Sequence, residues 1–140
     1  MAFRGAGASL AVGDGASPEV FTAIAEVIEY TGPEQTNDEF EVTHLGSSAK
    51  EFLAALKDNG SSDFECHFKP SNTQHQGLFT DVAAGTVKNY KMTWSDPDSS
   101  PNPTITFAAF ISNLSLNTPP NDSVKMSGSL RITGALTRNF

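Results

Sequence analysis

Strict alternation of apolar and polar residues is the feature that most limits what this chain can fold into. Along residues 123–133 every second side chain is apolar or glycine, and the side chains between them are Ser, Lys, Arg or Thr. Residues 62–69 repeat the pattern, with Phe64, Cys66 and Phe68 facing one way. A period of two places alternate side chains on opposite faces of a β-strand. The sequence therefore predicts a mainly β protein.

Less regular runs predict the remaining strands. They lie at residues 7–13, 19–30, 40–45, 90–94 and 105–116. In the last run the apolar register shifts between Ile111 and Leu114, which indicates a β-bulge. The run 19–30 is apolar on both faces. It fits either a central strand of a two-layer fold or a strand whose second face is covered by a neighbouring subunit.

Two stretches carry helix signals. In the first, Ser48 and Glu51 match a capping box, and Asn59-Gly60 supplies a left-handed stop. The apolar stripe of this expected helix consists of Phe52, Leu53 and Leu56. The second helix is expected to start near Ser71 and to end at Gly85. Its inward positions are His75, Leu78, Phe79 and Val82.

These elements predict a β-sandwich or partly open barrel of about seven or eight strands, with one or two α-helices on its flank. The length of 140 residues fits a single domain, residues 1–140. At the end of this domain, residues 135–140 are expected to form a mobile tail.

A polar, acidic loop is predicted at residues 31–39. Its members are Gly32, Pro33, Glu34, Gln35, Thr36, Asn37, Asp38 and Glu39. These side chains give the loop no apolar anchor, and ordering a backbone costs roughly 1–2 kcal/mol per residue. The loop is therefore expected to be mobile until a partner orders it.

Charge and cysteine content exclude several classes of protein. The net charge is −7, and the nine Lys and Arg residues form no cluster. Tight nucleic-acid binding is disfavoured because phosphate contacts need clustered cations. One cysteine excludes an internal disulfide framework. No apolar run reaches the ~20 residues of a membrane helix, and the first residues lack the apolar segment of a secretory signal.

No catalytic, metal or cofactor site is predicted. The histidines are His44, His67 and His75. They lack the spacing of metal ligands on a helix or beside cysteines. Cys66 shares its face with two phenylalanines, so it is expected to be a core residue rather than a nucleophile. Glu39 and Glu41 share a strand face, as paired acids do in some glycosidases, but a solvated face is the simpler interpretation.

Seven segments follow one another in a characteristic order along the chain. They are PEVFTAIAEV, the GP that opens the loop, EVTHL, EFLAALKD followed by Gly60, FECHFKP, HQGLF and GTVKNYKMTW. Together they resemble the major tail tube protein of long-tailed, non-contractile bacteriophages. The resemblance extends from about Phe3 to Gly134.

The resemblance implies the same β-rich architecture and a structural, non-enzymatic role. Copies would form hexameric rings whose inner strands continue from subunit to subunit. The rings would stack into a tube that conducts double-stranded DNA without binding it tightly. Implied partners are a tape-measure protein, tail-tip proteins and a tail terminator, with no membrane. Implied locations are the virion tail and, during assembly, the cytoplasm of a host bacterium. The loop at 31–39 would contact the adjacent ring.

Two other functions stay open at this point. One is a related secretion-tube or tail-completion ring protein. The other is a β-sandwich module that binds a carbohydrate or a receptor. Such modules usually expose a patch of aromatic side chains, whereas Tyr90 and Trp94 alternate onto an expected core face.

Three acids are candidates for lining the lumen of such a tube. Glu41, Asp63 and Glu65 occupy polar strand faces opposite apolar ones. Phosphates passing them would meet like charge and no adhesive cation. The alternative is that these acids face outer solvent or pair with Lys69, Lys125 or Arg131.

Overall fold

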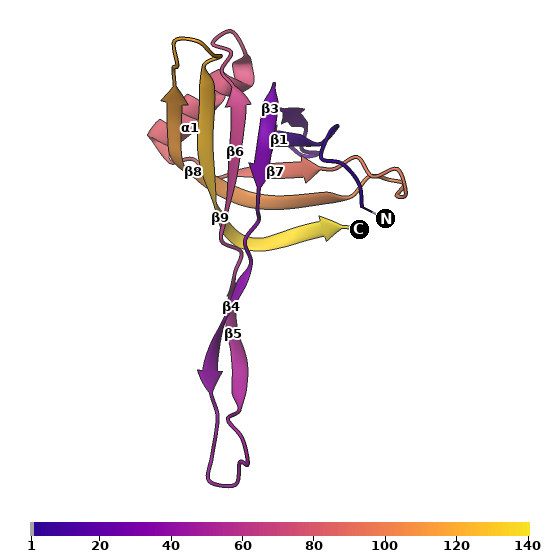
Figure 1. Ribbon diagram of the computed structural model, residues 1–140, viewed down its shortest axis with the longest axis vertical. Helices are drawn as coiled ribbons and strands as arrows, with labels where there is room; N and C mark the ends of the chain where they lie inside the picture. Colours follow the sequence, from indigo (N-terminus) through magenta and orange to yellow (C-terminus); the bar gives the residue numbers. More distant parts are fainter. Residues whose placement is uncertain (1) are drawn as a thin grey trace.

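Seven strands form one bent antiparallel sheet, and two more form a hairpin that projects from it (Figure 1). The computed structural model describes residues 2–140. Its elements are β1 (Ser9–Gly13), β2 (Phe21–Ala23), β3 (Val27–Thr31), β4 (Thr36–Glu41), β5 (Phe52–Asp58), β6 (Ser61–His67), α1 (Thr73–Ala84), β7 (Lys88–Thr93), β8 (Thr104–Asn117) and β9 (Lys125–Asn139). The order in the sheet is β2-β1-β7-β8-β9-β6-β3, and β4 pairs with β5. The prediction of a mainly β fold is confirmed.

The long strands β8 and β9 join two halves of this sheet. β7 pairs with Thr104–Ala109 of β8, whereas β6 pairs with Lys125–Arg131 of β9. We call β3, β6, residues 125–131 of β9 and residues 110–117 of β8 the β6 half. The remaining strand segments of the seven-stranded sheet form the β1 half. Figure 1 shows β8 and β9 curving from one half into the other.

Bulges accompany the bend of these two strands. The register of β8 against β9 shifts between Phe107 and Ala108 and again between Ile111 and Asn113. Gly134, on β9 at the first shift, has φ 82°, a left-handed conformation that glycine adopts without a steric penalty. The second shift is the bulge that the apolar register predicted.

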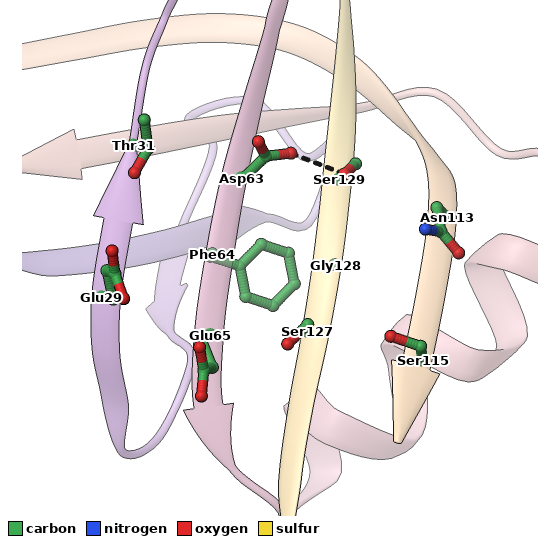
Figure 2. A pocket seen from close by; sticks show the side chains of 10 residues that line it. All are labelled: Glu29, Thr31, Asp63, Phe64, Glu65, Asn113, Ser115, Ser127, Gly128 and Ser129. Carbon is green, nitrogen blue, oxygen red and sulfur yellow. Dashed lines mark hydrogen bonds between the residues drawn. The ribbon is translucent and has the colours of Figure 1, made fainter. Parts of the chain in front are cut away.

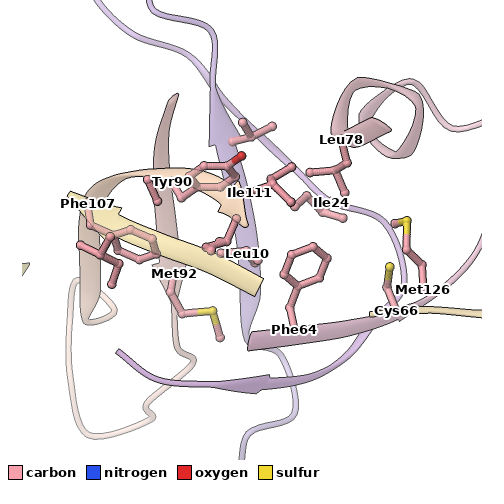
Figure 3. Close-up of a cluster of buried hydrophobic side chains, with 14 residues drawn as sticks. Leu10, Ile24, Phe64, Cys66, Leu78, Tyr90, Met92, Phe107, Ile111 and Met126 are labelled. Atoms are coloured by element: carbon pink, nitrogen blue, oxygen red, sulfur yellow. The ribbon is translucent and has the colours of Figure 1, made fainter. Parts of the chain in front are cut away.

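The core lies between the two halves of the sheet (Figure 3). Alternate residues of β1, β6, β7, β8 and β9 point into it, as their alternation predicted. The largest fully buried side chains include Tyr90, Phe107, Leu10, Leu78 and Met126. Cys66 is also fully buried, which confirms its assignment to the core.

Helix α1 covers one side of this core and confirms the second predicted helix. Its N-cap is Asn72, whose side chain accepts hydrogen bonds from the backbone N–H groups of Gln74 and His75. Gly85 ends it in the left-handed conformation at φ 67°. Leu78 and His75 are buried beneath it. No helix within residues 2–140 is long and apolar enough to span a membrane.

The first predicted helix is wrong, because its apolar stripe belongs to strand β5. Phe52, Leu53 and Leu56 are 50%, 52% and 86% exposed instead of packing on the sheet. The expected capping box is absent: the Glu51 carboxylate accepts a hydrogen bond from the Ser47 hydroxyl. Pairing with β4 outweighs the helix propensity of the segment, since propensity is a weak preference that long-range contacts override.

Two further expectations need correction. The predicted strand at 19–30 is broken into β2 and β3 by a turn in which Glu26 adopts φ 57°. The expected mobile tail at 135–140 is largely strand, because β9 extends to Asn139 and pairs there with Thr104–Phe107 of β8. Apolar and polar residues do not alternate regularly along residues 135–139. The sequence alone therefore does not indicate that this segment pairs with residues 104–107 of β8.

Candidate functional site

A polar hollow lies on the face of the β6 half that points away from the core (Figure 2). Its volume is about 290 Å³. Strand pairing arranges most of its side chains in two rows that cross β3, β6, β9 and β8. The rows are Thr31-Asp63-Ser129-Asn113 and Glu29-Glu65-Ser127-Ser115. Carboxylates therefore gather on β3 and β6, and hydroxyl and amide groups on β9 and β8.

The carboxylates of this hollow are not neutralised. Glu29 lies directly opposite Glu65 on the neighbouring strand, a like-charge pairing that disfavours the sheet. Asp63 accepts a hydrogen bond of 2.6 Å from the Ser129 hydroxyl. Over the described chain, none of the three acids forms an ion pair. The hollow is therefore an acidic surface, and the stability of the fold does not account for the three acids that lie there.

The nearest cations of the same sheet are held at the ends of the hollow. Arg131 Nη2 lies 3.0 Å from Asp58 Oδ2, and Lys125 Nζ lies 3.4 Å from Asp122 Oδ2. The Gly60 backbone N–H, and then Arg131, lower the pKa of Asp58. These partners hold the two cations away from the acids in the middle of the sheet.

The second candidate surface is the projecting hairpin, residues 34–58, which we call the arm. Figure 1 shows it extending away from the sheet. Five large apolar residues of the arm are exposed: Phe40, Leu45, Phe52, Leu53 and Leu56. Glu41 pairs with Phe52 on one face of the arm, and Phe40 pairs with Leu53 on the other. Each face of the arm therefore presents apolar surface to solvent.

The tip of the arm is held by local hydrogen bonds. The Gly46 N–H donates to His44 Nδ1 at 3.0 Å, and the Ser47 hydroxyl donates to the Glu51 carboxylate at 2.7 Å. Leu45, between them, is fully exposed. The tip thus presents an apolar side chain from an ordered turn.

The predicted loop at 31–39 forms the base and first strand of the arm. Thr31 ends β3, residues 32–33 lead to the arm, residues 34–35 form its base, and residues 36–39 belong to β4. The segment is not a loop throughout, because Thr36, Asn37 and Glu39 pair with β5, and Gln35 Nε2 donates to Asn59 Oδ1 at 2.8 Å. Sequence spacing could not reveal this partner strand.

The three candidate lumen acids do not lie together. Asp63 and Glu65 line the polar hollow, whereas Glu41 is on the arm. Glu29 completes the acidic group and is not among the acids that the sequence predicts for it. The sequence around it shows no clearly polar face, and only the register opposite Glu65 places Glu29 in the hollow.

The other reactive side chains are engaged in the fold. Burial first, and then Glu26 and Glu65, raise the pKa of Cys66 to about 11, so its thiol is protonated at neutral pH and unreactive. His75 uses both ring nitrogens in hydrogen bonds, to Lys69 and Ala25. No group of three or more His, Cys, Asp or Glu side chains in residues 2–140 is arranged to hold a metal ion.

Known proteins resemble this chain both in sequence pattern and in fold. A family model described as "Lambda phage tail tube protein, TTP" matches residues 3–138. No curated protein sequence matches significantly.

Several solved structures share the fold. A subunit in the tail of an empty gene transfer agent particle, refined with C6 symmetry, has a TM-score of 0.79 at 17% identity, covering 99% of this chain and 100% of that one. The SPP1 tail tube gives 0.75 at 11%, covering 99% and 79%. The sheath/tube terminator of the PVC extracellular contractile injection system gives 0.75 at 12%, covering 100% and 98%. At sequence identities this low, the similarity to these structures shows a shared fold only.

Proposed function

Because this chain belongs to the lambda phage tail tube protein family, and is thus a structural subunit of a tail tube, we propose that six copies close into a ring. Rings then stack into a hollow tube that carries double-stranded DNA into the host. The number six is supported by the C6 symmetry of the similar gene transfer agent tail. Assembly takes place in the host cytoplasm, on tail-tip proteins and around a tape-measure protein, and a tail terminator ends it.

The observation that carries this proposal is the pair of open edges on the β6 half. In residues 2–140, β3 pairs only with β6, and residues 110–117 of β8 pair only with β9. Unpaired edges are templates for further strands. The four strands of the half alternate in direction, so β3 of one copy meets β8 of the next in antiparallel orientation. A ring of copies therefore closes the sheet and removes both edges.

The polar face of the closed sheet lines the lumen. The opposite face of the β6 half is covered by its own core, so only the face with the hollow is free. Asp63 and Glu65, joined by Glu29, repeat around the channel. Passing phosphates meet like charge, and the cations of this face are already paired, so DNA slides without adhering.

The arm joins one ring to the next. A two-stranded hairpin is marginally stable alone in water, and this one exposes apolar side chains on each face. A second copy in the adjacent ring covers them. Residues 32–39 contribute the base and first strand of this contact. Because the contact is heterologous and does not close, it produces a filament.

Electron microscopy of the concentrated protein tests this function. Stacked rings with six subunits in each class average are expected. Monomers at every concentration would refute self-assembly. Rings with another number of subunits would refute the hexamer while leaving the edge-pairing argument intact.

A further inference from the structure

We propose that the arm of one copy docks into an apolar pocket beside the chain ends of a second copy, a contact that rests on the proposed stacking of rings. The pocket, which we call the terminal pocket, has a volume of about 300 Å³. Its apolar lining comes from Phe3, Trp94, Pro103, Ile105 and Phe140.

The terminal pocket combines open apolar surface with an aspartate, Asp96, and a nearby arginine, Arg138, neither of which forms an ion pair in the described residues. Phe140 and Phe3 are 69% and 43% exposed. The Arg138 guanidinium lies 5.6 Å from the centre of the Phe140 ring, and Arg138 is paired with Ile105 in the register of β9 and β8. Arg138 forms no ion pair with any described carboxylate. Asp96, at the same pocket, accepts a hydrogen bond from the Asp98 N–H.

One face of the arm has the complementary composition. Phe52 is half exposed and pairs with Glu41, and Ala54 pairs with Glu39 on the same face. Neither acid has a cationic partner in the part of the chain that the structure describes. An aromatic side chain beside two free carboxylates thus matches an apolar pocket beside a free arginine.

The two surfaces cannot meet within one chain. Figure 1 shows the arm extending away from the sheet, while both chain ends lie beside the sheet itself. Strand pairing along the arm holds it extended. The occupant of the terminal pocket is therefore the arm of another copy, with Phe52 in the pocket and Glu39 and Glu41 near Arg138.

Disulfide trapping between two variants tests the contact. Chains carrying Phe52→Cys are mixed with chains carrying Phe140→Cys, assembled and oxidised. The matched control replaces Phe52→Cys by Leu53→Cys, which is equally exposed but lies on the other face of the arm. A cross-linked heterodimer is expected from the first mixture and little from the control. Equal yields from tubes of both mixtures would overturn the docking proposal alone, whereas absence of any assembly by the wild-type chain would overturn the proposed function as well.

Charge exchange tests the polar part of the contact. Arg138→Glu and Glu41→Arg are each expected to abolish tube formation, and the chain carrying both changes is expected to recover it. Lys91→Glu is the control, because Lys91 pairs with Thr106 on the opposite face of the β1 half. Its tubes should form normally. Normal tubes from the Arg138→Glu single variant, or no recovery in the double variant although the monomer is folded, would refute the pairing.

Discussion

At the scale of single residues, His75 connects three segments that the sequence keeps apart. Its Nδ1 accepts the Lys69 N–H at 3.0 Å, and its Nε2 donates to the Ala25 carbonyl at 2.9 Å. Its ring stacks on Phe68 with centres 6.4 Å apart. The neutral imidazole thereby fixes α1 to the end of β6 and to the turn at Glu26. The sequence predicts a partly buried residue here; the side chain is fully buried, and the hydrogen bonds explain why it is a histidine.

Replacing this residue should destabilise the subunit. His75→Leu removes the hydrogen-bond partner of the Lys69 N–H and of the Ala25 carbonyl, both in part-buried hydrogen bonds, at an expected loss of about 1–3 kcal/mol in the free energy of unfolding. Urea unfolding of the monomer measures it. His44→Leu, at the exposed arm tip, serves as the control and should change little. Equal losses in the two variants would contradict this role.

Tyr90 presents the opposite case, a buried polar group without a partner. Its side chain is fully buried, and its hydroxyl forms no hydrogen bond with any described residue. Burial first, and then the Asp81 carboxylate, raise the pKa of Tyr90. An unfolded tyrosine ionises near pH 10, so above about pH 10 the folded state retains a proton that the unfolded state has lost, and stability falls as pH rises.

Tyr90→Phe should therefore be tolerated and should protect the fold in alkali. Removing the unpaired hydroxyl is expected to leave stability at pH 7 unchanged or raised by up to about 1 kcal/mol. The loss of stability between pH 9 and pH 11 should be smaller than in the wild-type chain, by about the same order. Urea unfolding at a series of pH values measures both, and a steeper alkaline loss in the variant would refute the assignment.

At the scale of elements, the arm shows what a single sequence can and cannot reveal. β6, β9 and α1 were predictable because their patterns are set by one apolar face and by local caps. β5 was not, because its alanine, leucine and lysine residues favour a helix locally, and its partner strand lies on the far side of a turn. The polar hollow was half predictable: alternation identifies Asp63 and Glu65, but only the register of β3 against β6 adds Glu29.

A pair of leucine variants distinguishes the arm from the core. Leu56→Ala, at an exposed position of β5, should change the monomer's free energy of unfolding by less than about 0.5 kcal/mol while lowering the yield of tubes. Leu130→Ala, fully buried on β9, should cost about 2–5 kcal/mol. Chemical denaturation and sedimentation of tubes give the two quantities. A large loss of monomer stability in Leu56→Ala would show that the arm packs against its own body.

At the scale of the whole molecule, the acidic and basic side chains of the polar face of the β6 half lie in different places. The middle of the β6 half holds carboxylates without counter-ions, and the cations of that face sit at its ends in ion pairs. In a closed ring this division would give a channel whose wall repels DNA phosphates along the strands. Repulsion of this kind depends on ionic strength, because salt screens exposed charges.

Reversing the proposed lumen charge should slow DNA without preventing assembly. Glu29→Lys together with Glu65→Lys keeps a like-charge pair across the two strands but reverses its sign, and it introduces cations that bind phosphate. Phage carrying these changes should form normal tails and eject DNA more slowly, most clearly at low salt. Asp98→Lys, in an exposed turn outside the hollow, is the control. Ejection at the wild-type rate at low salt by the double variant would refute the lumen assignment for these residues.

The position of the arm also decides how such a tube can grow. Each subunit has one arm, so under the proposed docking a stack would end in a ring of empty pockets at one end and a ring of free arms at the other. The two ends then differ chemically, and subunits add to them at different rates. Under the proposed docking, the contact that starts the tube and the contact that stops it therefore use opposite halves of the same pair of surfaces.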